Sequence, residues 1–179
     1  MVITYISTGS NIGDRYDALI RAREMLNNKA GIVTIHSSIY ETEPWGFDAE
    51  THFLNQVLVI QTMLQPLRLM KVILDIEKQM VRKRNHLRYE PRIIDIDILL
   101  YGRDIIKKHN LQIPHPRMQH RKFVLVPLSE IAPDMVHPVS KLRIAELLDQ
   151  VKDECKIKLW KSAADISLEA SGKHIRDIS

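Results

Sequence analysis

Two aspartates, Asp95 and Asp97, interrupt an apolar run in the stretch PRIIDIDILLYG at residues 91–102. The run is rich in isoleucine and leucine, which predicts a buried strand. Because alternate residues of a strand share a face, both carboxylates should point to one side, with their Cα atoms roughly 6.6 Å apart. Carboxylates at this spacing can share a pair of divalent cations, and all-oxygen ligands favour Mg²⁺. The other interpretation is that the aspartates of an edge strand face water, or that one of them pairs with Arg92.

A basic segment leads directly into these aspartates. Residues 78–92, KQMVRKRNHLRYEPR, contain six lysines and arginines against a single acid, Glu90. A charge run of this kind is in general a solvated surface loop. Its position beside paired aspartates favours a site for a phosphorylated ligand and its metal, because guanidinium groups bind phosphate oxygens bidentately. We expect the segment to act as a lid that orders over a nucleotide.

The composition limits the class of protein. The chain has 179 residues, 45% of them hydrophobic and 27% charged, which is ordinary for one globular domain. A net charge of +4 and a pI of about 9.2 favour an anionic partner. Cys155 is the only cysteine, so no intramolecular disulfide can form. The N-terminal MVITYIST has no signal-peptide pattern, and no apolar run could span a bilayer, so we expect a cytoplasmic protein without a membrane partner.

Several enzyme classes are excluded because their motifs are missing. No G-x-x-x-x-G-K-[ST] occurs, so the protein is not a P-loop enzyme. The motif set of protein kinases is also missing. The eight histidines show no zinc-like spacing with the cysteine.

The order of the predicted elements indicates the fold class. Hydrophobic spacing predicts strands at 2–8, 32–41, 53–62 and 93–100, and helices that begin after Asp14 and at Pro66. The order β-α-β-β-α-β is that of the ferredoxin-like α+β fold, an antiparallel sheet with two helices on one face.

The rest of the chain carries weaker patterns. It predicts a loop at 113–121, an amphipathic segment at 142–151 and a short strand at 156–160. We therefore predict a domain at residues 1–161, followed by a C-terminal extension at 162–179 for which the polar sequence predicts no regular structure.

A second candidate pocket lies on the predicted strand 53–62. Phe53 and Asn55 should share one face of it. Phe53 by itself is a typical core residue. Beside it, however, the Asn55 amide offers a donor and an acceptor that suit a flat heterocycle with amide-like edges. Trp45 and Phe47, in the preceding loop, could cover such a pocket or simply anchor the loop.

A series of motifs in order along the chain resembles a known family. The motifs are GSNIGD, SIYETEPWGF, FLNQV, IEKQMVRKR, PRIIDIDILLYG and IPHPRMQHRKFVLVPLSEIAPD. They are similar to those of the 6-hydroxymethyl-7,8-dihydropterin pyrophosphokinases of folate biosynthesis, from residue 1 to about residue 140. The combination of PR-x-x-D-x-D with PHP-x-x-x-x-R is highly specific.

The resemblance implies an activity and a set of site residues. Enzymes of this family transfer pyrophosphate from ATP to the hydroxymethyl group of the pterin and release AMP. Asp95 and Asp97 would hold two Mg²⁺ ions, and Asp97 is also a candidate proton acceptor. The implied catalytic arginines are Arg82 and Arg92. The implied ATP contacts are Glu77, Arg84, Arg88, Arg92, Ile98, Gln112, His115 and Arg121. The implied pterin contacts are Thr42, Glu43, Trp45, Phe53, Asn55 and Phe123.

The lid departs from the family pattern at three positions. Val81 and Glu90 stand where glycines are common, and Tyr89 stands where tryptophan is usual. Loss of both glycines should stiffen the lid.

Two rival functions remain open at the level of sequence. An RNA-binding module of the RNA-recognition-motif type shares the element order and fits a basic pI, but its aromatic RNP1 pattern is missing and the aspartates would repel a phosphate backbone. A metal-dependent nuclease or nucleotidyltransferase is the third possibility. We expect small-molecule substrates, no nucleic-acid partner and a monomer.

Overall fold

A computed structural model of the chain describes residues 1–43, 51–82 and 93–176. The strands are β1 (Val2–Ser10), β2 (Ile32–His36), β3 (Ile39–Thr42), β4 (Phe53–Thr62), β5 (Asp95–Tyr101), β6 (Ile106–Lys108), β7 (Leu111–Ile113) and β8 (Ile157–Lys161). The helices are α1 (Arg15–Lys29), α2 (Pro66–Arg82), a 3₁₀ turn η1 (Met118–His120), α3 (Lys122–Ile131), α4 (Ile144–Gln150) and α5 (Ala163–Arg176). No helix in the described ranges has the length and apolar composition needed to cross a bilayer.

One antiparallel sheet organises the molecule. Its strand order is β5-β1-β4-β3-β8, and β2 pairs with β4 beside β3. β1 pairs with β4 along its whole length, from Val2 opposite Thr62 to Ser10 opposite Leu54. β1 and β4 therefore form the centre of the sheet, and β5 is an edge strand that pairs with β1.

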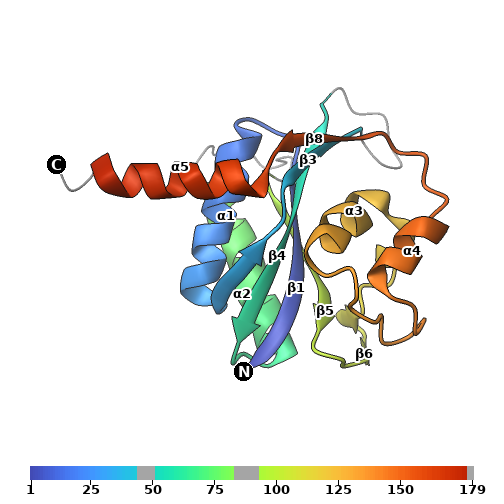
Figure 1. The fold of residues 1–179 in the computed structure, drawn as a ribbon. Coiled ribbons are helices and arrows are strands. Elements are labelled where there is room, and N and C mark those ends of the chain that lie inside the picture. The colour runs from blue at the N-terminus through green and yellow to red at the C-terminus, as the bar shows by residue number, and fades with distance from the viewer. Residues whose placement is uncertain (44–50, 83–92, 177–179) are drawn as a thin grey trace.

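Helices cover both faces of the sheet (Figure 1). α1 and α2 pack on one face, where Leu19, Leu26 and Leu69 are fully buried with Ile6 of β1. α3 and α4 pack on the other face and form a second apolar cluster. Ile96 and Ile98 of β5 belong to the first cluster. The period of two therefore places the aspartates of β5 on the α3 side.

The predicted strand 32–41 is in fact two strands. Ser37 and Ser38 interrupt it, because Ser37 Oγ accepts the Val57 N–H at 3.0 Å and the Ser38 N–H is donated to the Glu130 carboxylate. β2 and β3 thus pair with successive parts of β4, and β3 extends to Thr42. A doublet of serines, whose hydroxyls compete for backbone partners, was the available signal.

The prediction of no regular structure beyond residue 161 is wrong. Residues 163–176 form α5, which lies beside α1 (Figure 1). Ile166 is only 1% exposed, and the Tyr16 hydroxyl donates to Glu169 at 2.7 Å. The short predicted strand at 156–160 is confirmed as β8, which pairs with β3. The hairpin formed by β6 and β7 was not predicted.

Candidate active site

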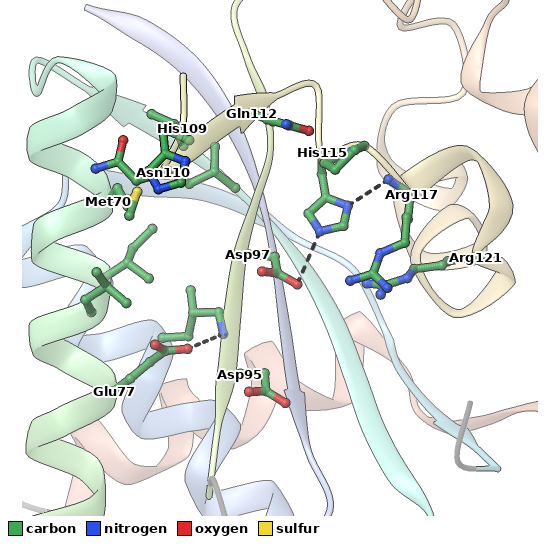
Figure 2. A pocket seen from close by; sticks show the side chains of 16 residues that line it. Met70, Glu77, Asp95, Asp97, His109, Asn110, Gln112, His115, Arg117 and Arg121 are labelled. Atoms are coloured by element: carbon green, nitrogen blue, oxygen red, sulfur yellow. Dashed lines mark hydrogen bonds and ion pairs between the residues drawn. The ribbon is translucent and has the colours of Figure 1, made fainter. Parts of the chain in front are cut away.

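A cleft of about 520 Å³ opens at the β5 edge of the sheet, between α2, β5, the β6–β7 hairpin and the segment 115–121 (Figure 2). The residues predicted for ATP or metal that line this cleft are Glu77, Asp95, Asp97, Ile98, Gln112, His115 and Arg121. The fold thus brings side chains from distant parts of the sequence into one space.

The two aspartates lie on the same face of β5. Asp95 is opposite Gly9 and Asp97 is opposite Ser7 in the register with β1. Both side chains line the cleft, and that of Asp97 is 51% exposed. Within the described residues, no group of three histidine, cysteine, aspartate or glutamate side chains could by itself hold a metal ion. Two carboxylates offer oxygen ligands only, the kind that a hard cation such as Mg²⁺ takes together with water and substrate phosphates.

Glu77 fixes the strand that carries the aspartates. It lies on α2, and its Oε1 accepts the backbone N–H of Ile96 at 2.9 Å (Figure 2). Because β5 is an edge strand, this N–H points away from β1 and needs another partner. Glu77 supplies that partner at the residue between Asp95 and Asp97, so it ties α2 to the part of β5 that carries both carboxylates.

His115 presents a donor toward Asp97. Its backbone N–H is donated to Leu99 O at 2.9 Å, and its Nδ1 accepts the Arg117 N–H at 3.3 Å. The neutral ring therefore carries its proton on Nε2, which lies 3.9 Å from Asp97 Oδ2. Burial lowers the pKa of His115, and Arg121 and Arg117 lower it further, whereas Asp97 raises it. The net direction favours a neutral imidazole that can donate to an anion near Asp97.

Arg121 links the cleft to the predicted pterin side. Its guanidinium carbon lies 5.5 Å from the centre of the Phe123 ring, a cation–π distance. Burial lowers the pKa of Arg121, as does Arg117, and Asp97 raises it. An arginine nevertheless stays protonated at neutral pH, so Arg121 supplies a partly desolvated positive charge.

Of the predicted pterin residues that the structure describes, Thr42, Phe53, Asn55 and Phe123 lie on the α3 side of the sheet. Asn55 is 3% exposed, and its Nδ2 donates to Thr42 Oγ1 at 2.8 Å. Phe53 shares the face of Asn55 and lies opposite Thr42 in the β3–β4 register. Phe123 packs against the cluster that contains Val57, which is also on this face. The carboxylate of Glu43 lies 3.7 Å from Lys156 Nζ, at the end of the same strand pair.

Several predicted residues lie outside the part of the chain that the structure describes. They are Trp45, Arg84, Arg88 and Arg92, the side chain of Arg82, and the departures from the family pattern at Val81, Tyr89 and Glu90. Their roles stay predictions.

The cleft residues that the sequence analysis did not assign to the site include Met70, His109, Asn110 and Arg117. Met70 could have been found, because it lies two helical turns before Glu77 on the same face of α2. His109 and Asn110 are at the tip of a hairpin that the sequence did not predict.

Comparisons with known proteins match the chain to one family along most of its length. The sequence model of the family described as 7,8-dihydro-6-hydroxymethylpterin-pyrophosphokinase (HPPK) matches residues 5–133. The 2-amino-4-hydroxy-6-hydroxymethyldihydropteridine pyrophosphokinase of Aquifex aeolicus is 40% identical, over 82% of this chain and 90% of that protein. The protein of the same name from Bacillus subtilis is 40% identical, over 92% of this chain and 93% of that protein.

A solved structure shows the same fold. Plasmodium falciparum HPPK-DHPS with pteroate has a TM-score of 0.68 and 19% identity, over 83% of this chain. The present chain spans 42% of the length of that Plasmodium chain. Together with the relatives above, these matches show that the chain belongs to the 7,8-dihydro-6-hydroxymethylpterin-pyrophosphokinase family of enzymes.

Proposed function

We propose that this protein transfers the terminal diphosphate of ATP to the hydroxymethyl group of 6-hydroxymethyl-7,8-dihydropterin and releases AMP, as a step of tetrahydrofolate biosynthesis. One observation carries the proposal. Asp95 and Asp97 share a face of β5 in a cleft that also contains His115 and Arg121, and Asn55 lies on the same face two strands away. A charged phosphate site and a buried amide for a heterocycle are thus neighbours.

The cleft has the polarity of a nucleotide site. Met70, Ile73 and Leu111 make one part of it apolar, which suits the adenine base. The aspartates, His115 and Arg121 make the other part charged, which suits metal-bound phosphates. We infer that Ile98 and Gln112 also contact the nucleotide, and that Arg84 and Arg88 close over it.

Two Mg²⁺ ions would be held by Asp95 and Asp97 together with phosphate oxygens. The oxygen-only donor set and the exposure of Asp97 fit such ions. When bound, magnesium would neutralise charge on the phosphates and lower the pKa of the attacking hydroxyl.

The side chains of the protein then have distinct tasks. Asn55, with Thr42 behind it, would hold the pterin edge between Phe53 and Phe123, so that the hydroxymethyl oxygen faces the β-phosphorus. That oxygen forms a bond to the β-phosphorus while the bond to the α,β-bridging oxygen breaks and AMP leaves. Asp97 would accept the hydroxyl proton. Arg82, Arg92 and Arg121 would balance the charge that develops on the transferred group.

The sheet order supports a finer statement about the fold. The order β5-β1-β4-β3, with α1 and α2 together on one face, is the one that a split βαβ arrangement requires. We therefore infer a ferredoxin-like core, to which α3, α4, β8 and α5 are added.

The test is AMP release from Mg-ATP, measured with and without 6-hydroxymethyl-7,8-dihydropterin. The proposal predicts AMP and pterin diphosphate in equal amounts and no AMP when the pterin is omitted. AMP release that does not depend on the pterin would contradict it and favour a nuclease or nucleotidyltransferase. Salt-sensitive oligonucleotide binding without ATP turnover would favour an RNA-binding module.

A further inference from the structure

Arg117 lies in the cleft, but the proposed reaction gives it no role. Its side chain is exposed and lines the cleft. Within the described residues, no carboxylate forms an ion pair with its guanidinium group. Figure 2 shows that the Arg117 and Arg121 side chains lie side by side, across the cleft from Asp97.

We propose that Arg117 determines nucleotide specificity by binding the γ-phosphate of ATP, so that the site distinguishes ATP from ADP. The inference rests on the proposed function, because it takes the cleft to be the ATP site. The sequence motifs did not assign a nucleotide contact to Arg117.

The local backbone holds Arg117 in place although its side chain is exposed. The Arg117 N–H is donated to His115 Nδ1, and the Arg121 N–H is donated to Met118 O at 3.2 Å. Met118, the next residue, is fully buried in the apolar cluster under α3. His115, Arg117 and Arg121 are therefore presented by one fixed turn.

The charges on this turn favour an anionic ligand. Arg117 and Arg121 both line the cleft, and the positive charge of Arg117 lowers the pKa of Arg121. Cations that crowd together in this way are stabilised when a polyanion enters between them. A guanidinium group is also the side chain best suited to bidentate contact with a phosphate.

The direction of the cleft indicates which phosphate Arg117 binds. Figure 2 shows Met70, His109 and Asn110 at one end and Arg117 and Arg121 at the other, with Asp97 between them. A nucleotide whose base occupies the apolar end passes its phosphates across Asp97 toward the arginines. Because Arg121 is the more buried of the two arginines, the exposed Arg117 is left for the last phosphate, which ADP lacks.

The experiment measures equilibrium binding of α,β-methylene-ATP and of ADP, each with Mg²⁺, to the wild type, Arg117→Ala and Arg117→Lys. Arg103→Ala removes an exposed arginine outside the cleft and controls for the loss of one positive charge. We expect Arg117→Ala to weaken binding of the ATP analogue by about 10- to 100-fold, the size of a lost charged contact, and binding of ADP by less than about threefold. Arg117→Lys should lie between the wild type and Arg117→Ala, and Arg103→Ala should match the wild type.

Equal weakening of both nucleotides, or no weakening of either, would overturn the assignment of Arg117. If the wild type bound neither nucleotide, the proposed function itself would fail, and the two failures are thus distinguishable. Because Arg117 is exposed, its variants should unfold at the wild-type temperature, and this measurement confirms that a binding loss is local.

Discussion

Asp95 and Asn55 lie in one row across the sheet, with only Gly9 of β1 between them. Residues directly opposite one another in antiparallel strands share a face, so both side chains rise from the same surface. Two strand spacings place their Cα atoms about 9.5 Å apart. Between the proposed metal ligand and the proposed pterin ligand, the surface of the sheet therefore carries only the backbone of Gly9.

Gly9→Ala should impair pterin binding more than folding. A Cβ at this position would lie 3.2 Å from Asn55 Oδ1, so the buried amide would have to move. Because a misplaced buried hydrogen bond costs about 1–3 kcal/mol, we expect KM for the pterin to rise by roughly 5- to 150-fold. Steady-state kinetics with pterin and ATP varied in turn measures this, and KM for ATP should change little.

Gly102→Ala is the matched control. A Cβ there would also meet a neighbour at 3.2 Å, the Val2 side chain, but Gly102 lies outside the cleft and has φ +53°. Alanine in this left-handed conformation costs about 1–2 kcal/mol, so Tm should fall while KM stays at the wild-type value. The same KM for the pterin in both variants would contradict the proposed need for a residue without a side chain at Gly9.

The relationship between Asp95 and Asn55 shows what the sequence could and could not predict. The period of two within each strand correctly placed Asp95 with Asp97, and Phe53 with Asn55. The register that puts Gly9 between the two strands depends on long-range pairing, which no local pattern encodes.

The features that the sequence did not predict depend on tertiary structure. α5 has a mostly polar sequence and buries Ile166 against the core, so tertiary contact decided its structure. Arg117 was one arginine among many in a basic chain. Only the fold shows that its side chain reaches the cleft and has no ion-pair partner among the described residues.

Thr42→Val should weaken the pterin site in a different way. The substitution keeps the shape of the side chain but removes the oxygen that accepts from Asn55 Nδ2. A buried amide donor left without a partner costs about 1–3 kcal/mol. Both Tm and the affinity for the pterin should fall, as measured by thermal unfolding and calorimetric titration. Thr42→Ser retains the hydroxyl and should stay close to the wild type in affinity; if it binds as weakly as Thr42→Val, the hydrogen bond is not the cause.

Glu130 should be one of the main residues that hold α3 against the sheet. Its carboxylate accepts from Ser38 N, Ser38 Oγ and the Tyr40 hydroxyl. Burial and this carboxylate raise the pKa of Tyr40 to about 12. We expect Glu130→Gln to lower the free energy of unfolding by about 2 kcal/mol, because hydrogen bonds to charged groups contribute about 1.5–3 kcal/mol.

A double-mutant cycle with Tyr40→Phe isolates the tyrosine contact. The loss in the double variant should be smaller than the sum of the two single losses, as measured by urea unfolding. Strict additivity would show that Glu130 and Tyr40 do not stabilise each other.

His137 should make the fold less stable at mildly acidic pH. The residue is 4% exposed, its Nδ1 accepts the Ser140 N–H, and burial lowers its pKa. The unfolded chain therefore binds this proton at a higher pH than the folded chain. The contribution of His137 to the free energy of unfolding is complete well above pH 6.5, the approximate ordinary pKa of histidine. It declines as the pH falls toward the pKa of His137 in the folded chain.

The His137→Asn variant tests this pH dependence. Asparagine keeps an acceptor near the position of Nδ1 but does not titrate, so the fall of Tm between about pH 7.5 and 5.5 should be shallower than in the wild type. His36 and His115, whose pKa values burial also lowers, account for the part that remains. His120→Asn, at an exposed histidine, controls for the loss of an imidazole ring. If the Tm of His137→Asn falls with pH as steeply as that of the wild type, His137 is not a source of the pH dependence.

Asp95 and Asp97 should jointly hold magnesium on the phosphates of ATP. Asp97→Asn should lower kcat by at least about 100-fold at saturating Mg²⁺, the size of one lost electrostatic contact to the transition state. Asp104→Asn, at an exposed aspartate outside the cleft, should keep the wild-type rate.

The most direct measurement is a crystal structure with α,β-methylene-ATP and Mg²⁺. We expect two cations, each about 2.0–2.1 Å from a carboxylate oxygen of Asp95 or Asp97 and from phosphate oxygens. A bound nucleotide with no cation in contact with either aspartate would contradict this expectation.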